Sequence, residues 1–79
     1  MSNLEIFNKA FIDLFKISDI ELGESLTYQS IPAWDSVGHM ELIARLETDF
    51  SIMLDMDDVI DFSSYAKGIE ILKKYQVDI

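Results

Sequence analysis

Apolar residues recur at steps of three and four along this chain, and this spacing limits the fold more than any other feature of the sequence. A helix over residues 3–16 would carry such residues along one face: Leu4, Phe7, Phe11, Leu14 and Phe15. A second helix, beginning after Asp35, would carry a similar row: Val37, Met40, Ile43, Leu46 and Phe50. Only three glycines and one proline occur in 79 residues, and this scarcity of turn residues argues against a fold of many hairpins.

Capping residues predict where the first two helices begin. Ser2 and Glu5 have the spacing of a capping box, in which each side chain bonds the backbone of the other. Asp35 is a favourable N-cap for the second helix. Between the two helices, residues 18–35 break the apolar spacing, so we expect a long loop there. Its apolar residues would attach it to the core: Ile20, Leu22, Leu26 and Ile31.

The last third of the chain predicts two further helices. Asp55 is placed to cap a short helix near residues 57–61, and Ser63 or Ser64 to cap a last helix that runs to about residue 75. The core-facing residues of the last helix would be Ile69 and Leu72. The prediction is therefore one all-α domain over residues 1–79, a four-helix bundle of three longer helices and a short third helix.

Charge narrows the kinds of partner. Fifteen Asp and Glu residues against six Lys and Arg give a formal net charge of −9, which disfavours binding to nucleic acid or to anionic lipid. Eight of these acids and a single base, Arg45, fall within residues 35–61. One interpretation is a solvated face that keeps a small protein soluble. The other is a docking surface for partners that carry a basic patch.

Several kinds of site and location are disfavoured by composition. Without cysteine there is no disulfide or thiolate site, and a single histidine makes structural zinc improbable. The aspartates at 55, 57, 58 and 61 lack the glycine and spacing of a calcium-binding EF-hand loop. No apolar stretch approaches the roughly 20 residues that span a bilayer, and residues 1–5 do not resemble a signal peptide. We expect a cytoplasmic, monomeric protein with no metal site and no membrane insertion.

One segment carries a more specific pattern. Asp35-Ser36-Val37-Gly38-His39-Met40-Glu41-Leu42-Ile43 resembles the phosphopantetheine attachment site of acyl carrier proteins, in which Asp-Ser-Leu is followed by two variable residues, an apolar residue, Glu and Leu. The likeness continues through residues 44–50, an acidic stretch that ends in Phe. Leu54, Asp57 and Asp58 look like the start of that family's third helix. Length, helix order and acidity also agree, so the resemblance covers essentially the whole chain.

The resemblance implies a carrier and not an enzyme. A phosphopantetheinyl transferase would attach the 4′-phosphopantetheine of coenzyme A to Ser36, and the thiol of that arm would carry an acyl group as a thioester. Asp35 would belong to the sequence that the transferase reads, besides capping the helix. Acyl-loading and acyl-processing enzymes with basic patches would dock on residues that the family uses for contact: Val37, Met40 and Glu41, with added charge from Glu47 and Asp57. For Val37 and Met40 the alternative is packing in the core.

The sequence also allows other functions. Trp34, Gly38 and His39 depart from the pattern of fatty-acid carriers, whereas patterns with Trp-Asp-Ser and a following His occur in carriers dedicated to specialised pathways and in peptidyl carrier domains. An aminoacyl or peptidyl carrier of a nonribosomal-type pathway would share the chemistry, and an unmodified acidic helical adaptor would share the surface. A hydrolase triad of Asp35, Ser36 and His39 is disfavoured, because neighbours on one helix do not converge on a nucleophile. We expect His39 to be an exposed helix residue near the arm.

Overall fold

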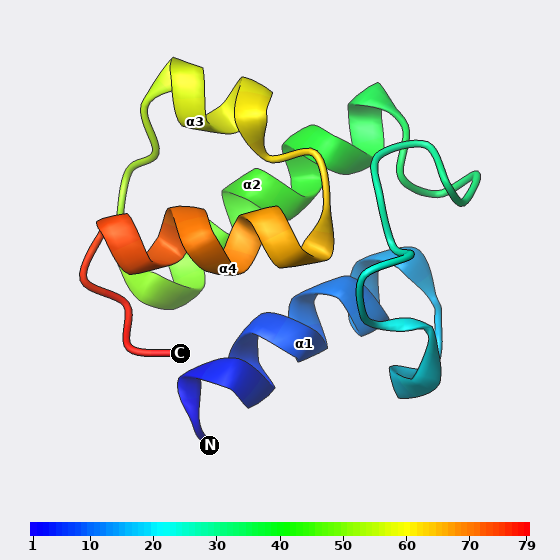
Figure 1. Ribbon diagram of the computed structural model, residues 1–79, viewed down its shortest axis with the longest axis horizontal. Coiled ribbons are helices and arrows are strands. Elements are labelled where there is room, and N and C mark those ends of the chain that lie inside the picture. Colours follow the sequence, from blue (N-terminus) through cyan, green and yellow to red (C-terminus); the bar gives the residue numbers. More distant parts are fainter.

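A computed structural model describes all 79 residues, and it contains four α-helices and no β-strand (Figure 1). The helices are α1 (Asn3–Phe15), α2 (Ser36–Phe50), α3 (Met56–Asp61) and α4 (Tyr65–Lys74), with a 3₁₀ turn, η1 (Asp19–Glu21), between α1 and α2. The predicted all-helical class is confirmed. None of the four helices is both long enough and apolar enough to cross a membrane.

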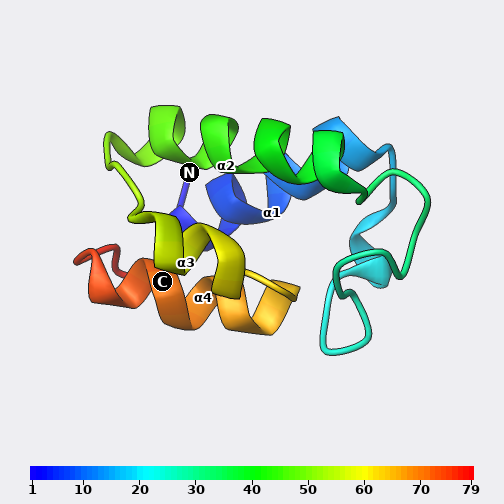
Figure 2. The same cartoon turned by 90° about the horizontal axis from the view of Figure 1, so that it is seen from above.

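The segment between α1 and α2, residues 16–35, gathers at one end of the molecule beside the start of α2 (Figures 1 and 2). Backbone hydrogen bonds tie this connecting segment to the junction between α3 and α4. The Tyr28 amide donates to the Ser63 carbonyl at 2.8 Å, and the Tyr65 amide donates to the Leu26 carbonyl at 2.9 Å. The segment is therefore fixed against the helices at a point distant in sequence.

Three of the predicted caps are present. Ser2 and Glu5 form the capping box, with the Glu5 amide donating to Ser2 Oγ at 3.1 Å and the Ser2 amide donating to Glu5 Oε1 at 3.0 Å. The Asp35 side chain caps α2, and Ser64, one of the two predicted serines, caps α4. These side chains accept hydrogen bonds from first-turn amides that have no partner within their own helix. Asp55 occupies the N-cap position of α3, but its side chain makes no capping hydrogen bond.

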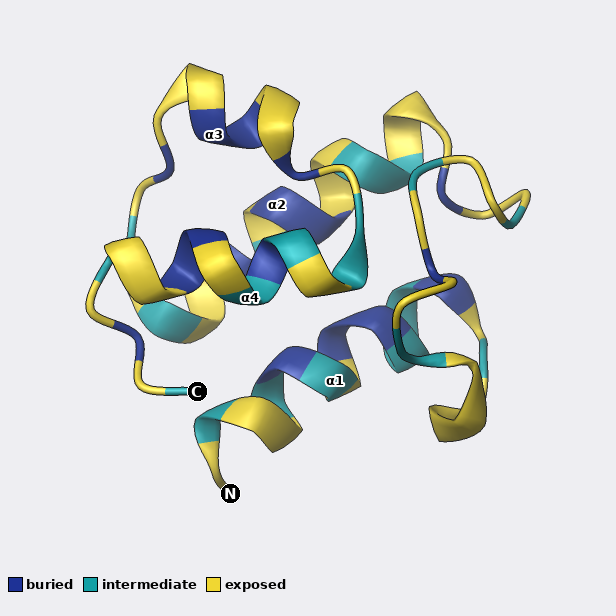
Figure 3. Cartoon of the chain, in the orientation of Figure 1, coloured by how far each residue is buried: buried dark blue, intermediate teal, exposed yellow.

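The core is built around aromatic rings from three parts of the chain. Trp34, from the connecting segment, is fully buried and stacks on Phe15 of α1 at a centroid distance of 5.5 Å. Its ring also meets Phe11 edge-on at 5.5 Å and Phe62 at 6.4 Å. Figure 3 shows the buried positions on the sides of the helices that face one another. Edge-on and offset aromatic pairs such as these add to the stabilisation from burial alone.

Two residues predicted to face the core are instead exposed, Leu4 and Ile20. Val37 and Met40, for which partner contact and core packing were both open, are exposed as well. In α2 the buried residues are Leu42, Ile43 and Leu46. The side of α2 that carries Gly38 lies close to Ala33 and Phe15. A Cβ at position 38 would overlap the Ala33 carbonyl oxygen and lie 3.3 Å from the Phe15 ring. Since each residue of a helix turns by about 100°, Val37 points away from that contact. In α4, Gly68, Ile71 and Leu72 are buried, whereas Ile69 is only half-buried.

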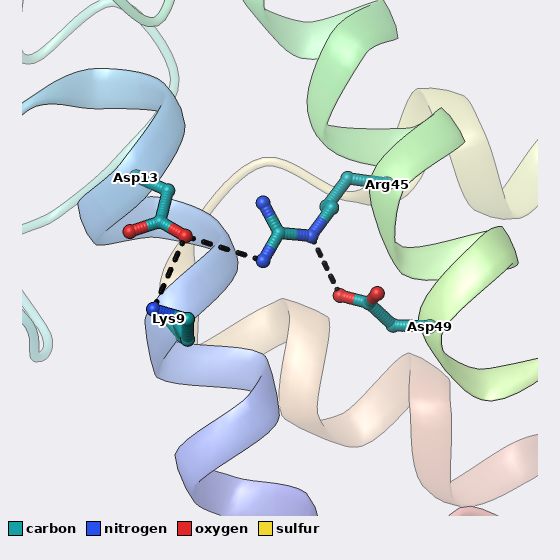
Figure 4. Close-up of polar contacts among 4 residues, drawn as sticks. All are labelled: Lys9, Asp13, Arg45 and Asp49. Carbon is teal, nitrogen blue, oxygen red and sulfur yellow. Dashed lines mark hydrogen bonds and ion pairs between the residues drawn. The ribbon is translucent and has the colours of Figure 1, made fainter.

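An ion cluster joins α1 to α2 (Figure 4). Arg45 donates from Nε to Asp49 at 2.8 Å and from Nη2 to Asp13 at 3.3 Å, and Asp13 also pairs with Lys9 at 3.5 Å. The hydrogen bond to Asp49 is the main reason that the pKa of Arg45 is raised. The side chains are partly exposed, so the cluster adds orientation between the helices more than stability.

A second polar contact joins α3 to α4. The carboxylate of Asp58 is buried and accepts hydrogen bonds from Lys74 Nζ at 2.6 Å and from the Tyr75 hydroxyl at 2.5 Å. The Tyr75 hydroxyl in turn accepts a hydrogen bond from the Asp55 amide at 2.9 Å. The bond from Lys74 is the main cause that lowers the pKa of Asp58 below its ordinary value.

Candidate functional site

Ser36 is exposed on the first turn of α2, where backbone donors are free. Asp35 Oδ1 accepts a hydrogen bond from the Gly38 amide at 2.8 Å, and the Asp35 carbonyl accepts one from the His39 amide. The amides of Ser36 and Val37 make no backbone hydrogen bond. A group with negative charge on Ser36 Oγ would therefore meet unpaired donors at the positive end of a 15-residue helix.

Tyr28 brings a hydroxyl to Ser36 from the connecting segment. Tyr28 Oη and Ser36 Oγ share a hydrogen bond at 3.0 Å. The backbone of Tyr28 is held by its bond to the Ser63 carbonyl, and its ring meets the His39 ring edge-on at 5.5 Å. Tyr28 is thus fixed on both sides, and its hydroxyl orients the serine hydroxyl.

His39 forms a hydrogen-bonded relay from Trp34 to Val59. Trp34 Nε1 donates to His39 Nδ1 at 3.0 Å, and His39 Nε2 lies 2.8 Å from the Val59 carbonyl oxygen. Since indole N–H only donates and a carbonyl only accepts, the ring must be neutral with its proton on Nε2. The Val59 carbonyl lies in the last turn of α3, where helix carbonyls lack a partner within the helix.

This relay corrects the predicted role of His39 and excludes one kind of chemistry. His39 is half-buried and packed between rings, whereas an exposed position was expected. Both of its nitrogens are occupied, so it cannot accept a proton from Ser36. A hydrolase triad needs a base in hydrogen-bond contact with the nucleophile, and His39 makes no such contact with Ser36.

A pocket of about 300 Å³ opens beside Ser36, between α2 and α3. Its lining is largely apolar: Tyr28, Ser36, His39, Met40, Met56, Val59, Ile60, Phe62 and Ser63. Met40, Met56 and Ile60 are 55%, 70% and 70% exposed and surround the mouth, whereas Val59 and Phe62 are buried and form the floor with His39. Apolar concave sites of this size with a few polar groups are typical of small-molecule binding.

The predicted partner residues do not all have the same environment. Val37 and Met40 are exposed, which excludes the alternative that they pack in the core. Glu41 and Asp57 are exposed as well. Glu47 is half-buried, and its Oε2 accepts a hydrogen bond from the Leu54 amide at 2.9 Å. Glu47 therefore holds the turn between α2 and α3.

The eight acids of residues 35–61 divide into two groups. Four take part in contacts within the protein, as cap, turn or ion-pair residues: Asp35, Glu47, Asp49 and Asp58. The side chains of the other four are exposed and make no hydrogen bond or ion pair: Glu41, Asp55, Asp57 and Asp61. Together with exposed apolar side chains, these acids make up a surface that we call the α2–α3 face: Val37, Met40, Glu41, Asp55, Met56, Asp57, Ile60 and Asp61.

Three residues of this site were not predicted from the sequence: Met56, Ile60 and Tyr28. Met56 and Ile60 are four residues apart on α3, and this helical pair was the available indication of an apolar face there. Nothing in the sequence indicated that Tyr28 would reach Ser36, because that contact depends on how the connecting segment folds back. No group of three or more His, Cys, Asp or Glu side chains lies in an arrangement that could hold a metal ion.

No protein-family model, curated protein or solved structure matches the chain. Function therefore has to be inferred from the geometry and chemistry of these residues.

Proposed function

We propose that this protein is a carrier that holds acyl intermediates on a 4′-phosphopantetheine arm attached to Ser36. One observation carries the proposal: the exposed hydroxyl of Ser36 lies at the start of a capped helix and at the mouth of an apolar pocket. Asp-Ser at such a position is the pattern that the sequence shares with acyl carrier proteins. The proposal includes the four-helix bundle and long first loop of that family, a cytoplasmic location and a specialised pathway.

The residues around Ser36 suit a phosphodiester. The free amides of Ser36 and Val37 would donate to phosphate oxygens, and the Tyr28 hydroxyl is within reach of the ester oxygen. In the attachment reaction Ser36 Oγ bonds to the phosphorus of coenzyme A next to pantetheine, the hydroxyl proton is lost, and adenosine 3′,5′-bisphosphate leaves. The bound arm supplies a thiol, which the chain itself lacks because it has no cysteine.

The α2–α3 face supports the docking part of the proposal. It combines free carboxylates such as Glu41 and Asp57 with exposed Val37 and Met40, directly beside Ser36. A basic patch near the active-site entrance of an enzyme would be attracted to the carboxylates, and the apolar side chains would be buried on contact. Such a partner would bind where the cargo is attached.

The same face also favours a second candidate, an adaptor that docks basic partners without any modification. Its exposed Met56 and Ile60 need no arm in order to bind a partner. The adaptor and the carrier differ in one property, which is whether Ser36 accepts phosphopantetheine. A peptidyl carrier would accept it as well and would differ in cargo.

The test is incubation with coenzyme A, Mg²⁺ and a transferase of broad specificity, followed by measurement of the intact mass. Ser36→Ala removes the proposed acceptor. Ser63→Ala is the matched control, because Ser63 is an exposed serine that lines the same pocket.

We expect the wild-type protein and Ser63→Ala to gain one phosphopantetheine and Ser36→Ala to gain none. If wild type gains nothing while a known carrier is modified under the same conditions, the protein is not a carrier. If Ser36→Ala gains the same mass, the attachment site is wrong.

A further inference from the structure

The floor of the pocket limits what the proposed carrier can hold. We infer that the cargo is an apolar acyl group no longer than octanoyl, and that His39 sets the limit on its length. This inference rests on the proposed function, because it concerns the group that the arm on Ser36 would present to the pocket.

The size of the pocket limits the length of the chain. Its volume of about 300 Å³ is at the small end of the range for small-molecule sites, so an octanoyl chain fits it whereas a dodecanoyl chain exceeds it. An acyl chain that enters past Met40 and Ile60 meets His39, Val59 and Phe62 as the deepest lining residues. Behind them lies Trp34, which is fully buried and packed between Phe11 and Phe15. A longer chain has no open path into the core.

The floor also resists displacement. To move aside, the His39 ring has to break its bonds to Trp34 Nε1 and to the Val59 carbonyl. The Trp34 donor would then be left buried without a partner, which is costly because water cannot replace His39 there. The free energy gained by burying further methylenes would be offset by this loss. The hydrogen-bonded His39 ring therefore fixes the depth of the pocket.

The lining favours an apolar acyl group over an aminoacyl group. The pocket has no carboxylate among its lining residues, so an ammonium group held inside it would have no opposite charge to pair with. Of the two acids next to floor residues, Asp58 is already bonded to Lys74 and Tyr75, and Asp61 is exposed outside the lining. The polar groups of the lining are hydroxyls of Tyr28, Ser36 and Ser63, together with the occupied nitrogens of His39.

The experiment loads Ser36 directly from acyl-coenzyme A donors with acetyl, butyryl, octanoyl and dodecanoyl groups, and from one aminoacyl donor, β-alanyl-coenzyme A. Mass spectrometry first confirms that each group is attached. The thermal midpoint of each form is then compared with that of the protein carrying the free arm. The single tryptophan gives a second readout, since the NMR signal of the Trp34 indole N–H reports contact with the His39 floor.

We expect butyryl to raise the midpoint by about 4–8 °C, the shift that one or two buried methylenes give in a domain of this size, and octanoyl to raise it further. Dodecanoyl should raise it no further than octanoyl, the indole signal should move with octanoyl, and β-alanyl should leave both unchanged. A midpoint that still rises from octanoyl to dodecanoyl overturns the inference, as does an octanoyl group that changes neither readout or a β-alanyl group that acts like butyryl.

His39→Ala should extend the pocket, so that dodecanoyl stabilises the variant more than octanoyl does. Met40→Ala is the matched control, because it widens the mouth without changing the floor and should leave the length limit in place. If His39→Ala keeps the wild-type limit, His39 does not set it. If this variant does not fold, the wild-type series still decides the length limit. Failure to gain any mass would overturn the proposed function, whereas loading with no dependence on cargo would overturn this inference alone.

Discussion

At the scale of single residues, His39 connects three parts of the chain through one imidazole. Its Nδ1 accepts a hydrogen bond from Trp34, in the connecting segment, and its Nε2 donates one to Val59 of α3, while its own backbone belongs to α2. The ring therefore serves the core and forms the floor of the pocket at the same time.

Replacing His39 should reveal the cost of breaking this relay. His39→Ala leaves the Trp34 donor and the Val59 acceptor unpaired, so the free energy of unfolding should fall by about 1–3 kcal/mol. His39→Gln should lose less, since an amide both donates and accepts. Urea denaturation followed by Trp34 fluorescence measures both. Equal losses in the two variants would show that the hydrogen bonds contribute little.

The sequence did not predict this arrangement, and the reason is physical. Trp34 lies outside any helical repeat, so its burial could not be inferred from spacing, and His39 was expected on the exposed side of α2. Contacts of this kind depend on how the connecting segment packs. Asp35, by contrast, caps a helix that begins one residue later, and such local interactions are readable from sequence.

At the scale of helices, close packing explains an unusual residue near the start of α2. A Cβ on Gly38 would overlap the carbonyl oxygen of Ala33 and press on the Phe15 ring. The absence of a side chain lets the connecting segment lie directly against the helix.

Gly38→Ala should therefore destabilise the protein, although alanine is normally favoured over glycine within a helix by about 1 kcal/mol. We expect a loss of about 1–3 kcal/mol, the usual range for an overpacked site, in urea denaturation. Ala44→Gly, at an exposed position of α2, serves as the comparison and should show the ordinary cost of about 1 kcal/mol. A stabilised Gly38→Ala variant would contradict the packing described here.

The contact between α3 and α4 should make stability depend on pH through Asp58. Its pKa is lowered in the folded protein, chiefly by Lys74, so the ionised carboxylate stabilises the fold at and above the ordinary value of about 4. This stabilisation is lost as the pH falls through the lowered pKa.

Asp58→Asn should be less stable than wild type at neutral pH, and the difference should shrink as the pH is lowered from about 6 to below 3. Thermal midpoints measured across that range provide the test. Asp57→Asn, an exposed neighbour with no bonding partner, should follow the wild-type curve more closely. A constant gap between wild type and Asp58→Asn would rule out this carboxylate as a source of acid sensitivity.

At the scale of the whole molecule, the distribution of charge is more informative than its sum. Part of the acid excess of residues 35–61 is used internally, as Arg45 with Asp49 and Lys74 with Asp58 show. What remains free lies on the α2–α3 face around the pocket. The helical class was predictable because apolar spacing is a property of each segment, whereas the pocket depends on how α2 and α3 meet.

If the α2–α3 face attracts its partners by charge, modification by the transferase should slow as ionic strength rises, since the screening length is about 10 Å at 0.1 M salt. Glu41→Gln should lower kcat/KM at low salt and weaken this dependence. Glu70→Gln, exposed on α4, changes the net charge equally and should have little effect. A rate that does not respond to salt would argue against electrostatic docking.

The central claim is that Ser36 carries phosphopantetheine, and fragment mass spectrometry tests it most directly. After incubation with coenzyme A and the transferase, trypsin should release a peptide of residues 17–45, which contains four serines: Ser18, Ser25, Ser30 and Ser36. The account predicts that fragment ions place the added group on Ser36 alone. An unmodified peptide, or the group on any of the other three serines, would contradict it.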